Sequence, residues 1–588
     1  MARVPPHALH PRPNGARALA CAASVLAAFA AGLVFLVYGA ADGLSWIDAV
    51  RAGLISLSTW WLAWGAATAL LGLTAHLPAP PTNTNPIRGT TVIIVPVYNE
   101  DPRDTFARIA AMDASLHACG PQFTIDFAVL SDTRDDAIAA DERQWFAHLT
   151  AQQAGAGRMF YRRRTDNTGR KAGNIEDFIT TSGAAWDYAV ILDADSLMEG
   201  ATVLEMIRRM EGDPSLGLLQ TLPKTVGAQT LFGRAMQFSA VFHSPAFARG
   251  VAAMQGRSGP FWGHNAIVRM RAWAESCGLP VLSGPPPFGG HILSHDSVEA
   301  ALLARAGWTV RLDDDLQGSY EGGPENIIDH AKRDRRWCQG NLQHTKVIRA
   351  PGLLAWNRFS LFQGIFAYAA PLIWLAFIAA SIAAIPLADE LNYFPQANWP
   401  FPVFPNDQTS KAIGLALGVF GLLVMPKLLV ALDAIRTGRA RGFGGAGKTL
   451  RAVLAELALT SLIAPILLAF QSRSVIQVLL GRDGGWPTNN RGDGGLSAQT
   501  AWVAGRWIML WGAGGIAVTQ TLAPVLTLWL MPVALPMILA PLLIWWTARP
   551  AAATRFSVPQ DSTPPPILAR HAAILAAWTT PIAKAKRA

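Results

Sequence analysis

Long stretches without charged residues flank a polar middle region and predict helices that cross a membrane. A crossing of the hydrocarbon core needs roughly 20 apolar residues. Stretches of at least this length occupy residues 18–41, 52–75, 359–388, about 412–432 and 507–548, with Lys427 the single charge among them. The last stretch is long enough for two passes, with a break near residues 519–524. The pattern therefore predicts six crossings, two before the middle region and four after it.

Residues 451–482 have a weaker apolar pattern than these stretches. The longest uncharged run within them, residues 457–472, contains Pro465. A run of this length is short for a crossing and suits an interfacial or re-entrant helix. Six crossings plus this segment are predicted, and eight crossings are the alternative.

The distribution of Lys and Arg predicts the orientation, because short cytoplasmic loops are enriched in both. Residues 435–451 contain five of them, whereas residues 389–410 contain acids and neither Lys nor Arg. The first segment is therefore predicted to be cytoplasmic and the second external. The resulting organisation is a tail with two spans (residues 1–88), a cytoplasmic domain (89–348), two spans (349–434), a cytoplasmic basic loop with the interfacial helix and a gating loop (435–505), two spans (506–548) and a cytoplasmic tail (549–588).

Composition agrees with a multi-pass membrane protein. Charged residues make up 15% of the chain, against about 25% in a typical soluble protein. The net charge of +9 is explained by cytoplasmic loops that lie against anionic membrane lipids, so nucleic acid is not an expected partner. The four cysteines have no CxxC spacing, which indicates neither a zinc site nor a disulfide framework.

The middle region has the alternating pattern of an α/β domain. Strand-like runs occupy residues 90–99, 123–132, 158–163 and 188–195, and helix-like stretches occupy residues 101–116, 137–153 and 171–181. This rhythm predicts a mostly parallel sheet with helices on both faces. In such sheets, ligands bind at the carboxyl ends of the strands.

Acidic residues fall at those strand ends. Glu100 follows the first strand, Asp132 the second, and Asp193 and Asp195 the fourth. Carboxylates grouped around one crevice repel one another unless a positive charge lies among them. Mg²⁺ or Mn²⁺ is the predicted cation, shared with the phosphates of a nucleotide diphosphate. An isolated DxD is a weak signal, because acids often cap a turn.

Two further motifs each allow two interpretations. Asp296, in a Ser-His-Asp sequence ahead of an apolar helical run, is either a functional acid or a helix N-cap. Residues 332–337 (KRDRRW) are either a binding motif or a basic patch beside the next membrane span. Their order along the chain favours the functional interpretation.

The ordered motifs YNE, SD, KAGN, DAD, SHD and RDRRW resemble the family-2 processive glycosyltransferases, which include the cellulose, chitin and hyaluronan synthases. Residues 333–337 replace the leading Gln of the QxxRW box of that group with Arg333. The surrounding segments, residues 261–270, 288–308, 318–342 and 458–472, are similar to the glucans biosynthesis glucosyltransferase H family. That resemblance covers about residues 90–485 and implies a Rossmann-like (GT-A type) catalytic domain in the bacterial inner membrane.

The resemblance also implies a role for each residue. It assigns nucleotide contacts to Tyr98, Glu100, Asp132, Lys171, Asn174, Asp193 and Arg336, acceptor contacts to Trp337, Trp262, His264 and Asn265, the metal to Asp195 and the general base to Asp296. The implied partners are UDP-glucose, a growing β-glucan, membrane lipids and acyl carrier protein. The implied reaction is processive, inverting transfer of glucose, with passage of the glucan to the periplasm. Residues 471–486 occupy the place of a gating loop, for which a plain connector is the alternative.

Two other functions remain open at this point. Another membrane polysaccharide synthase, such as a cellulose-like enzyme, would share the same motifs. A non-enzymatic transporter would share the spans, but the predicted spans contain almost no acids or bases, which ion pathways usually need.

Overall fold

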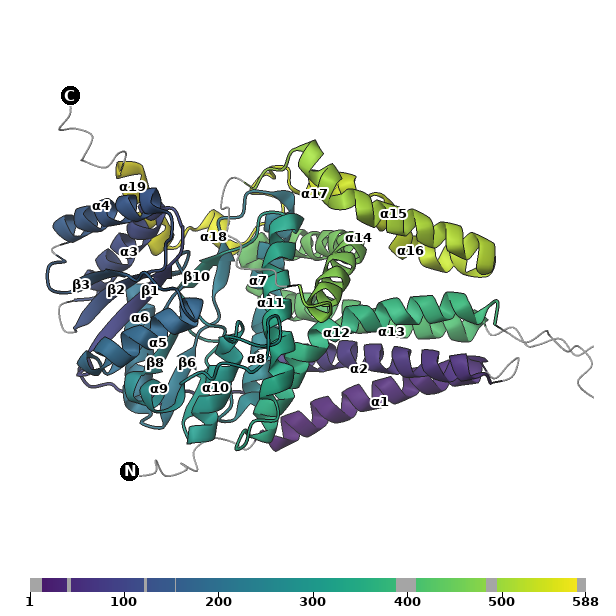
Figure 1. The fold of residues 1–588 in the computed structure, drawn as a ribbon, viewed down its shortest axis with the longest axis horizontal. Helices are drawn as coiled ribbons and strands as arrows, with labels where there is room; N and C mark the ends of the chain where they lie inside the picture. Colours follow the sequence, from purple (N-terminus) through teal and green to yellow (C-terminus); the bar gives the residue numbers. More distant parts are fainter. Residues whose placement is uncertain are drawn as a thin grey trace, which may run out of the picture.

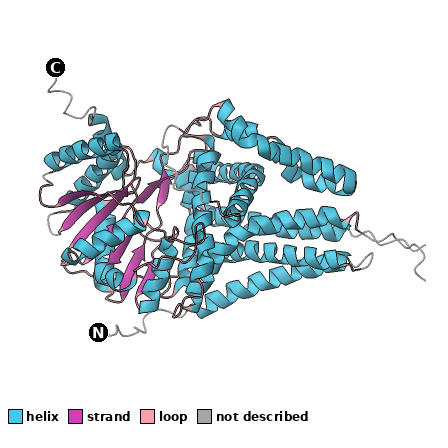
Figure 2. Ribbon diagram, in the orientation of Figure 1, coloured by secondary structure: helices cyan, strands magenta, loops and turns pink. Residues whose placement is uncertain are grey.

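The computed structural model describes residues 13–39, 44–120, 124–153, 155–387, 409–482 and 494–578. An α/β domain lies on one side of the molecule, and a layer of long helices extends from the other side (Figure 1). Figure 2 shows that the strands gather in the α/β domain, whereas the extended layer consists of helices. The predicted fold class, an α/β domain inserted between apolar helices, is confirmed.

A seven-stranded sheet forms the centre of the α/β domain, in the order β3-β2-β1-β4-β8-β6-β9. Strands β1 to β4 are parallel, whereas β8 runs antiparallel between β4 and β6. A smaller sheet has the order β5-β10-β7. The strands are β1 (Thr91–Val97), β2 (Ile125–Ser131), β3 (Met159–Arg163), β4 (Tyr188–Ile191), β5 (Leu197–Met198), β6 (Leu216–Gln220), β7 (Lys224–Val226), β8 (Ala266–Arg269), β9 (Thr309–Leu312) and β10 (Ser319–Gly322).

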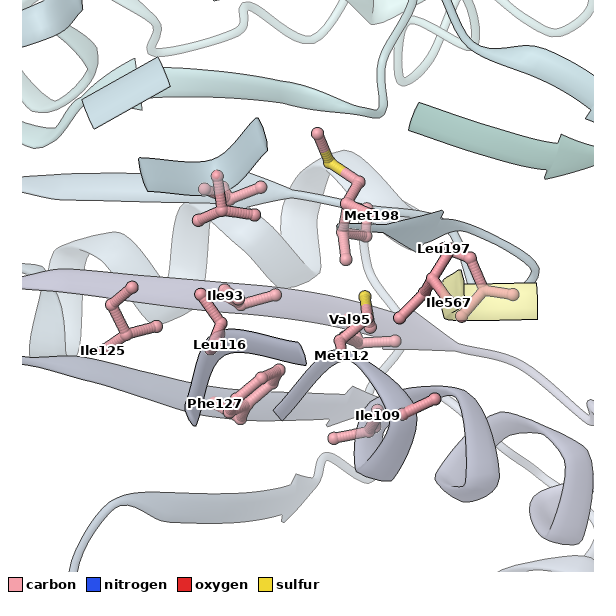
Figure 3. Close-up of a cluster of buried hydrophobic side chains, with 14 of the residues drawn as sticks. Ile93, Val95, Ile109, Met112, Leu116, Ile125, Phe127, Leu197, Met198 and Ile567 are labelled. Carbon is pink, nitrogen blue, oxygen red and sulfur yellow. The ribbon is translucent and has the colours of Figure 1, made fainter. Parts of the chain in front are cut away.

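Helices cover both faces of the large sheet, so its central strands are apolar on both sides. Ile93 and Val95 of β1 pack into the core formed with α3, and Figure 3 shows Ile93 beside Leu116 and Val95 beside Met112 of that helix. The alternate residues of β1 face a second core beside α5, α9 and α10. The helices of the domain are α3 (Pro102–His117), α4 (Asp136–Gln152), α5 (Arg170–Ser182), α6 (Gly200–Gly212), α7 (Leu231–Phe242), α8 (Ser244–Gln255), α9 (Met270–Ser276), α10 (His295–Ala306) and α11 (Ile327–Val347).

Five helices in the described part of the chain are long and apolar enough to cross a membrane. They are α1 (Asn14–Gly39), α2 (Trp46–Thr74), α12 (Ala355–Ala384), α13 (Thr409–Arg436) and α14 (Ala446–Leu479). A sixth span is formed if Pro524–Ile538 and Ala540–Thr547, which meet at a bend of 55°, count as one. These two segments contain α16 (Thr527–Ile538) and α17 (Ala540–Thr547), and they follow α15 (Ala498–Leu522) after the predicted break.

Helix α14 differs from the prediction for residues 451–482. It is continuous through Pro465 over 34 residues, so the expectation of a segment too short to cross is wrong in length. The uncharged run is shorter than the helix because the helix also contains charged residues. One of them, Glu456, is buried against Lys427 of α13. Figure 1 nevertheless shows α14 strongly foreshortened, at a large angle to α12 and α13.

Three predicted segments lie wholly or partly outside the described residues. They are the external loop (residues 389–410, described only from residue 409), the gating segment after residue 482, and the basic chain end beyond residue 578.

Candidate active site

A pocket of about 350 Å³ lies at the carboxyl ends of the central strands. It brings together motifs from positions 96 to 337 of the chain. Of the predicted site residues, it is lined by Tyr98, Glu100, Asp132, Lys171, Asn174, Asp193, Trp262, His264, Asp296, Arg336 and Trp337. Asp195 and Asn265 do not line it.

The tips of β1 and β2 are joined by Asn99, which the sequence analysis did not single out. Its φ of +53° lies in the left-handed region, where Asn is one of the tolerated residues. Its backbone N–H donates to Thr133 Oγ1 (2.9 Å), and its side-chain Oδ1 accepts from the N–H of Arg134 (3.2 Å). This tight turn holds the neighbouring Tyr98 and Glu100 on the pocket wall.

Asp132 is held by partners within the domain. Arg164 contacts both carboxylate oxygens, at 2.5 and 2.8 Å, and the Asn174 amide donates to Oδ1 at 2.9 Å. Asp132 therefore enters the pocket as a neutralised carboxylate whose acceptor sites are largely used. Arg164 was missed because it follows β3, and only the strand order places β3 beside β2.

Lys171, at the start of α5, forms an ion pair with Asp193 and donates to the Gly263 carbonyl (2.8 Å). Burial acts to raise the pKa of Asp193, but Lys171 and then His264 outweigh it and hold this pKa well below its ordinary value. Asp193 is therefore ionised at neutral pH. The ammonium lies between the DxD turn and the loop that carries Trp262.

Asp195, the second acid of the DxD, lies behind the pocket wall. Its carbonyl accepts from Arg108 of α3 (2.9 Å), and a Cβ at Gly322 would lie 3.3 Å from its Oδ2. The preceding Glu321 has a raised pKa, caused first by burial and increased by Asp195 and Asp193. The described residues contain no group of three or more His, Cys, Asp or Glu able to hold a metal. One or two carboxylates completed by substrate phosphates remain a suitable Mg²⁺ site, because Mg²⁺ is often held that way.

Asn265 supports the DxD turn and does not contact the pocket. It is fully buried, with a φ of +51°. Its Oδ1 accepts from Ser196 Oγ (2.5 Å), and its Nδ2 donates to Ser319 Oγ (2.8 Å). The predicted acceptor contact of Asn265 is therefore not found, because its amide is committed to these buried partners.

Asp296 lies in the first turn of α10, as its second residue. The N-cap of this helix is Ser294, so the alternative interpretation of Asp296 as the cap is wrong. A Cβ at Gly263 would lie 3.6 Å from Asp296 Oδ2, which places this acid beside the loop of Trp262. On the other side, a Cβ at Gly340 of α11 would lie 2.2 Å from Ser294 Oγ. Glycine at position 340 thus lets α11 approach the turn before Asp296.

His295, next to Asp296, is an additional member of the pocket wall. Its Nδ1 lies 2.8 Å from Glu299 Oε2. Burial acts to lower the pKa of His295, but Glu299 outweighs this effect and raises the pKa above its usual value. The imidazole of His295 is thus held by Glu299 next to the position of Asp296.

The basic motif on α11 belongs to the pocket, so its interpretation as a patch beside the membrane is not supported. Arg333, Arg336 and Trp337 all line the pocket wall. The Arg333 guanidinium lies over the Trp337 ring, 4.6 Å from its centroid. This cation–π contact gives a structural role to the Arg that replaces Gln in the box.

The comparisons with known proteins agree with this geometry. The model of the glycosyl transferase family group 2 matches residues 188–413. A glucans biosynthesis glucosyltransferase H from Cereibacter sphaeroides is 63% identical over 96% of this chain and 95% of its own. The chain belongs to that family. A protein of the same name from Bradyrhizobium diazoefficiens is 38% identical over 93% of this chain and 74% of its own.

The chain is accordingly a glycosyltransferase of glucan biosynthesis, and the charges in its pocket suit such a reaction. Five basic side chains line the wall, namely Arg134, Arg170, Lys171, Arg333 and Arg336. Two of the acids there are neutralised by ion pairs, Asp132 by Arg164 and Asp193 by Lys171. The wall therefore has a surplus of positive charge that can receive a phosphorylated sugar donor.

A second cavity in this glycosyltransferase, of about 820 Å³, meets the pocket at Trp262, which lines both. Its walls come from α2, α8, α10, α12 and α13. Aromatic and neutral polar side chains contribute to these walls beside aliphatic residues, and they include Trp61, Trp64, Trp356, Asn357, Ser360 and Gln363. Among the described residues, Lys427 is the one charged residue on its wall, and its ammonium contacts both Glu456 oxygens (2.7 and 2.9 Å).

Proposed function

We propose that this protein transfers glucose from UDP-glucose to a growing β-glucan, with inversion, and passes the glucan across the inner membrane. The observation that carries the proposal is the shared wall at Trp262 between the charged pocket and the aromatic cavity. A polymer extended in the first space has a continuous route into the second. Aromatic faces and neutral polar groups suit a sugar chain that must bind and slide.

The proposed reaction uses groups already placed around the pocket. Asp296 removes the proton from the acceptor hydroxyl as that oxygen attacks the anomeric carbon. The new glycosidic bond forms on the face opposite the breaking bond, and UDP departs with the electron pair. Arg336 binds the diphosphate of the departing UDP, since a guanidinium suits phosphate oxygens. Trp337 and Trp262 provide stacking surfaces for the acceptor sugar, each being more than a third exposed (38% and 37%).

A divalent cation, Mg²⁺ or Mn²⁺, is part of the proposal. Asp195 would hold it, with Asp193 near the same diphosphate. When bound, the cation neutralises charge on the phosphates and on the leaving UDP. Half-buried Glu321, whose pKa is raised first by burial and also by Asp195, adds a further carboxylate near this acid.

The test uses membrane vesicles whose cytoplasmic face points outward, supplied with labelled UDP-glucose. We expect labelled β-glucan inside the vesicles, dependent on Mg²⁺ or Mn²⁺ and abolished by EDTA. Linkage analysis of the product separates this function from a cellulose-like synthase. Absence of polymer with UDP-glucose and every other nucleotide sugar would falsify the proposal. Full activity in EDTA would contradict the metal role alone.

The cytoplasmic position of the catalytic domain is proposed on the basic residues 436–451, of which Arg436 ends α13, and Arg439 and Arg441 follow it. Reporters fused near Gly444 and near residue 392 check this orientation. We expect cytoplasmic activity from the first fusion and periplasmic activity from the second. The same side for both would show that the crossing between them is misassigned.

A further inference from the structure

The C-terminal tail returns from the last membrane helix to the catalytic domain. After α17, the chain forms α18 (Pro559–Ser562) and then α19 (Pro566–Ala577), which lies against α3 and near α4 (Figure 1). On the way, Arg234 of α7 anchors the tail. Its guanidinium pairs with Asp561 (2.6 Å) and donates to the carbonyls of Arg555 (2.7 Å) and Ala553 (2.8 Å). The tail is thus fixed before α19 begins.

Helix α19 is part of the core of the domain. Ile567, at its start, is 1% exposed and packs in the same cluster as Leu197 and Met198. Figure 3 shows Ile567 beside Leu197, two residues after the DxD acid Asp195. At the other end of α19, the Trp578 ring stacks on Trp145 of α4, with centroids 5.2 Å apart. Both ends of the helix are therefore held on the domain by apolar contacts.

Between these two ends, a chain of polar contacts leads from α19 to the DxD turn. His571 Nε2 lies 3.0 Å from Asp104 Oδ1. Asp104 Oδ2 lies 2.9 Å from Arg108 Nε. The same Arg108 donates from its terminal nitrogen to the carbonyl of Asp195 (2.9 Å). One face of α3 thus links the tail to the backbone of the residue proposed to hold the metal.

The charges in this chain stabilise its arrangement. Burial acts to raise the pKa of Asp104, but the contacts with His571 and Arg108 outweigh it and lower the pKa to about 2. Asp104 is therefore ionised at neutral pH, and its carboxylate holds the Arg108 guanidinium at Nε. A guanidinium held on one side by a carboxylate has fewer conformations from which it can lose its contact with the Asp195 carbonyl.

We propose that His571 is a positioning residue for the sugar-donor site, acting through Asp104 and Arg108 on the DxD turn. This inference rests on the proposed function, because it assumes that Asp195 serves donor binding. None of these three residues lines the pocket, so their effect is on the position of Asp195 and not on the substrate itself. Loss of the contact widens the range of positions of the DxD turn and weakens binding of the metal–nucleotide unit.

The experiment measures glucan synthesis against UDP-glucose concentration, and binding of UDP with Mn²⁺, in full-length protein. His571→Ala is expected to raise KM and the Kd for UDP with Mn²⁺ severalfold, with a smaller change in kcat. His571→Gln should recover most of the loss, because its amide nitrogen can reach Asp104 as Nε2 does. Arg570→Ala, one position earlier on α19, is the matched control and should resemble wild type.

A double-mutant cycle tests the route of the effect. If His571 acts through Arg108, adding His571→Ala to Arg108→Ala should change KM little further, since interacting residues are not additive. Wild-type KM and UDP affinity in His571→Ala would overturn the proposal, as would full additivity with Arg108→Ala. A wild-type protein that makes no glucan from UDP-glucose would instead contradict the proposed function, so the two failures are distinguishable.

Discussion

The catalytic pocket and the cavity beneath it share Trp262 but are built from opposite kinds of side chain. The pocket wall contains five basic and four acidic residues. The acidic residues are Glu100, Asp132, Asp193 and Asp296. In the part of the chain that the structure describes, the cavity wall has Lys427 as its one charged residue, and that charge is paired with buried Glu456. The character of the lining side chains changes at Trp262, the residue that the two spaces share.

Under the proposed function, this difference separates the binding of a charged donor from the passage of a neutral polymer. A diphosphate donor requires basic side chains in fixed positions, which are best held where a sheet edge and helix ends converge. A sliding glucan requires surfaces that bind each sugar weakly and equally, because a deep charged site would hold the chain in one register. A substitution in the pocket should therefore leave the cavity able to accommodate the polymer, and a substitution in the cavity should leave donor binding in the pocket unchanged.

The largest expected effect is that of Asp296→Asn in the pocket. Asn cannot accept the proton of the acceptor hydroxyl, so synthesis should fall by roughly 10²–10⁴-fold, the usual contribution of a positioned general base. UDP binding should persist, because Asp296 faces the acceptor side near Trp262. The measurements are glucan synthesis and UDP affinity on the same preparation.

The position of Asp296 also defines the control for that variant. Because Ser294 is the N-cap, Asp296→Asn removes a negative charge from the first turn and leaves the cap in place. The thermal unfolding temperature should fall only modestly, since a half-buried charge near a helix N-terminus, as at Asp296, contributes at most about 2 kcal/mol. Near-wild-type synthesis in Asp296→Asn would assign the base to another residue.

The outline of the pocket could be predicted because it depends on local patterns. Buried strands read as apolar runs, and their polar ends follow directly, so Asp132 and Asp193 were placed correctly. Partners brought in by strand order could not be predicted in this way. Arg164 reaches Asp132 only because β3 lies beside β2, and Glu321 reaches Asp195 only because β10 pairs with β5.

Other differences between the prediction and the structure arise where two residues satisfy the same local rule. Ser294 and Asp296 are both favoured N-caps, and the backbone turn decides between them. Asn265 lies in a motif whose neighbours Trp262 and His264 reach the pocket, but its left-handed backbone turns its amide into the domain. For the tail, the sequence predicts only a cytoplasmic position. The contacts of α19 with α3 could not be predicted, because they link segments more than 400 residues apart.

A smaller effect is expected from filling the cavity below the pocket. Ser360→Phe places an aromatic ring in the space between α2 and α12 and should reduce glucan synthesis severalfold, because the polymer path narrows. UDP affinity and release of UDP without polymer extension should stay near wild type. Ser360→Ala, which leaves the space open, is the control. Equal losses of donor binding and synthesis in Ser360→Phe would show that the two spaces do not act separately.

The smallest expected effect is a pH dependence of stability caused by the pair of His295 and Glu299. The folded-state pKa of His295 is raised, so the pair stabilises the protein fully below the unfolded value of about 6.5. The stabilisation is lost as the pH rises through the raised folded pKa. Asp296 also favours the charged imidazole, so it adds to the effect of Glu299, whereas burial and Lys171 oppose it and limit the net rise of the pKa.

Glu299→Gln tests this assignment because it removes the partner and keeps its size. The unfolding temperature of the variant should lie below that of wild type at pH 6, and the difference should narrow as the pH rises past the folded pKa. Glu275→Gln on α9 is the control, since its partner Arg271 is exposed and such pairs contribute little. A difference between Glu299→Gln and wild type that stays constant with pH would mean that Glu299 acts by packing alone.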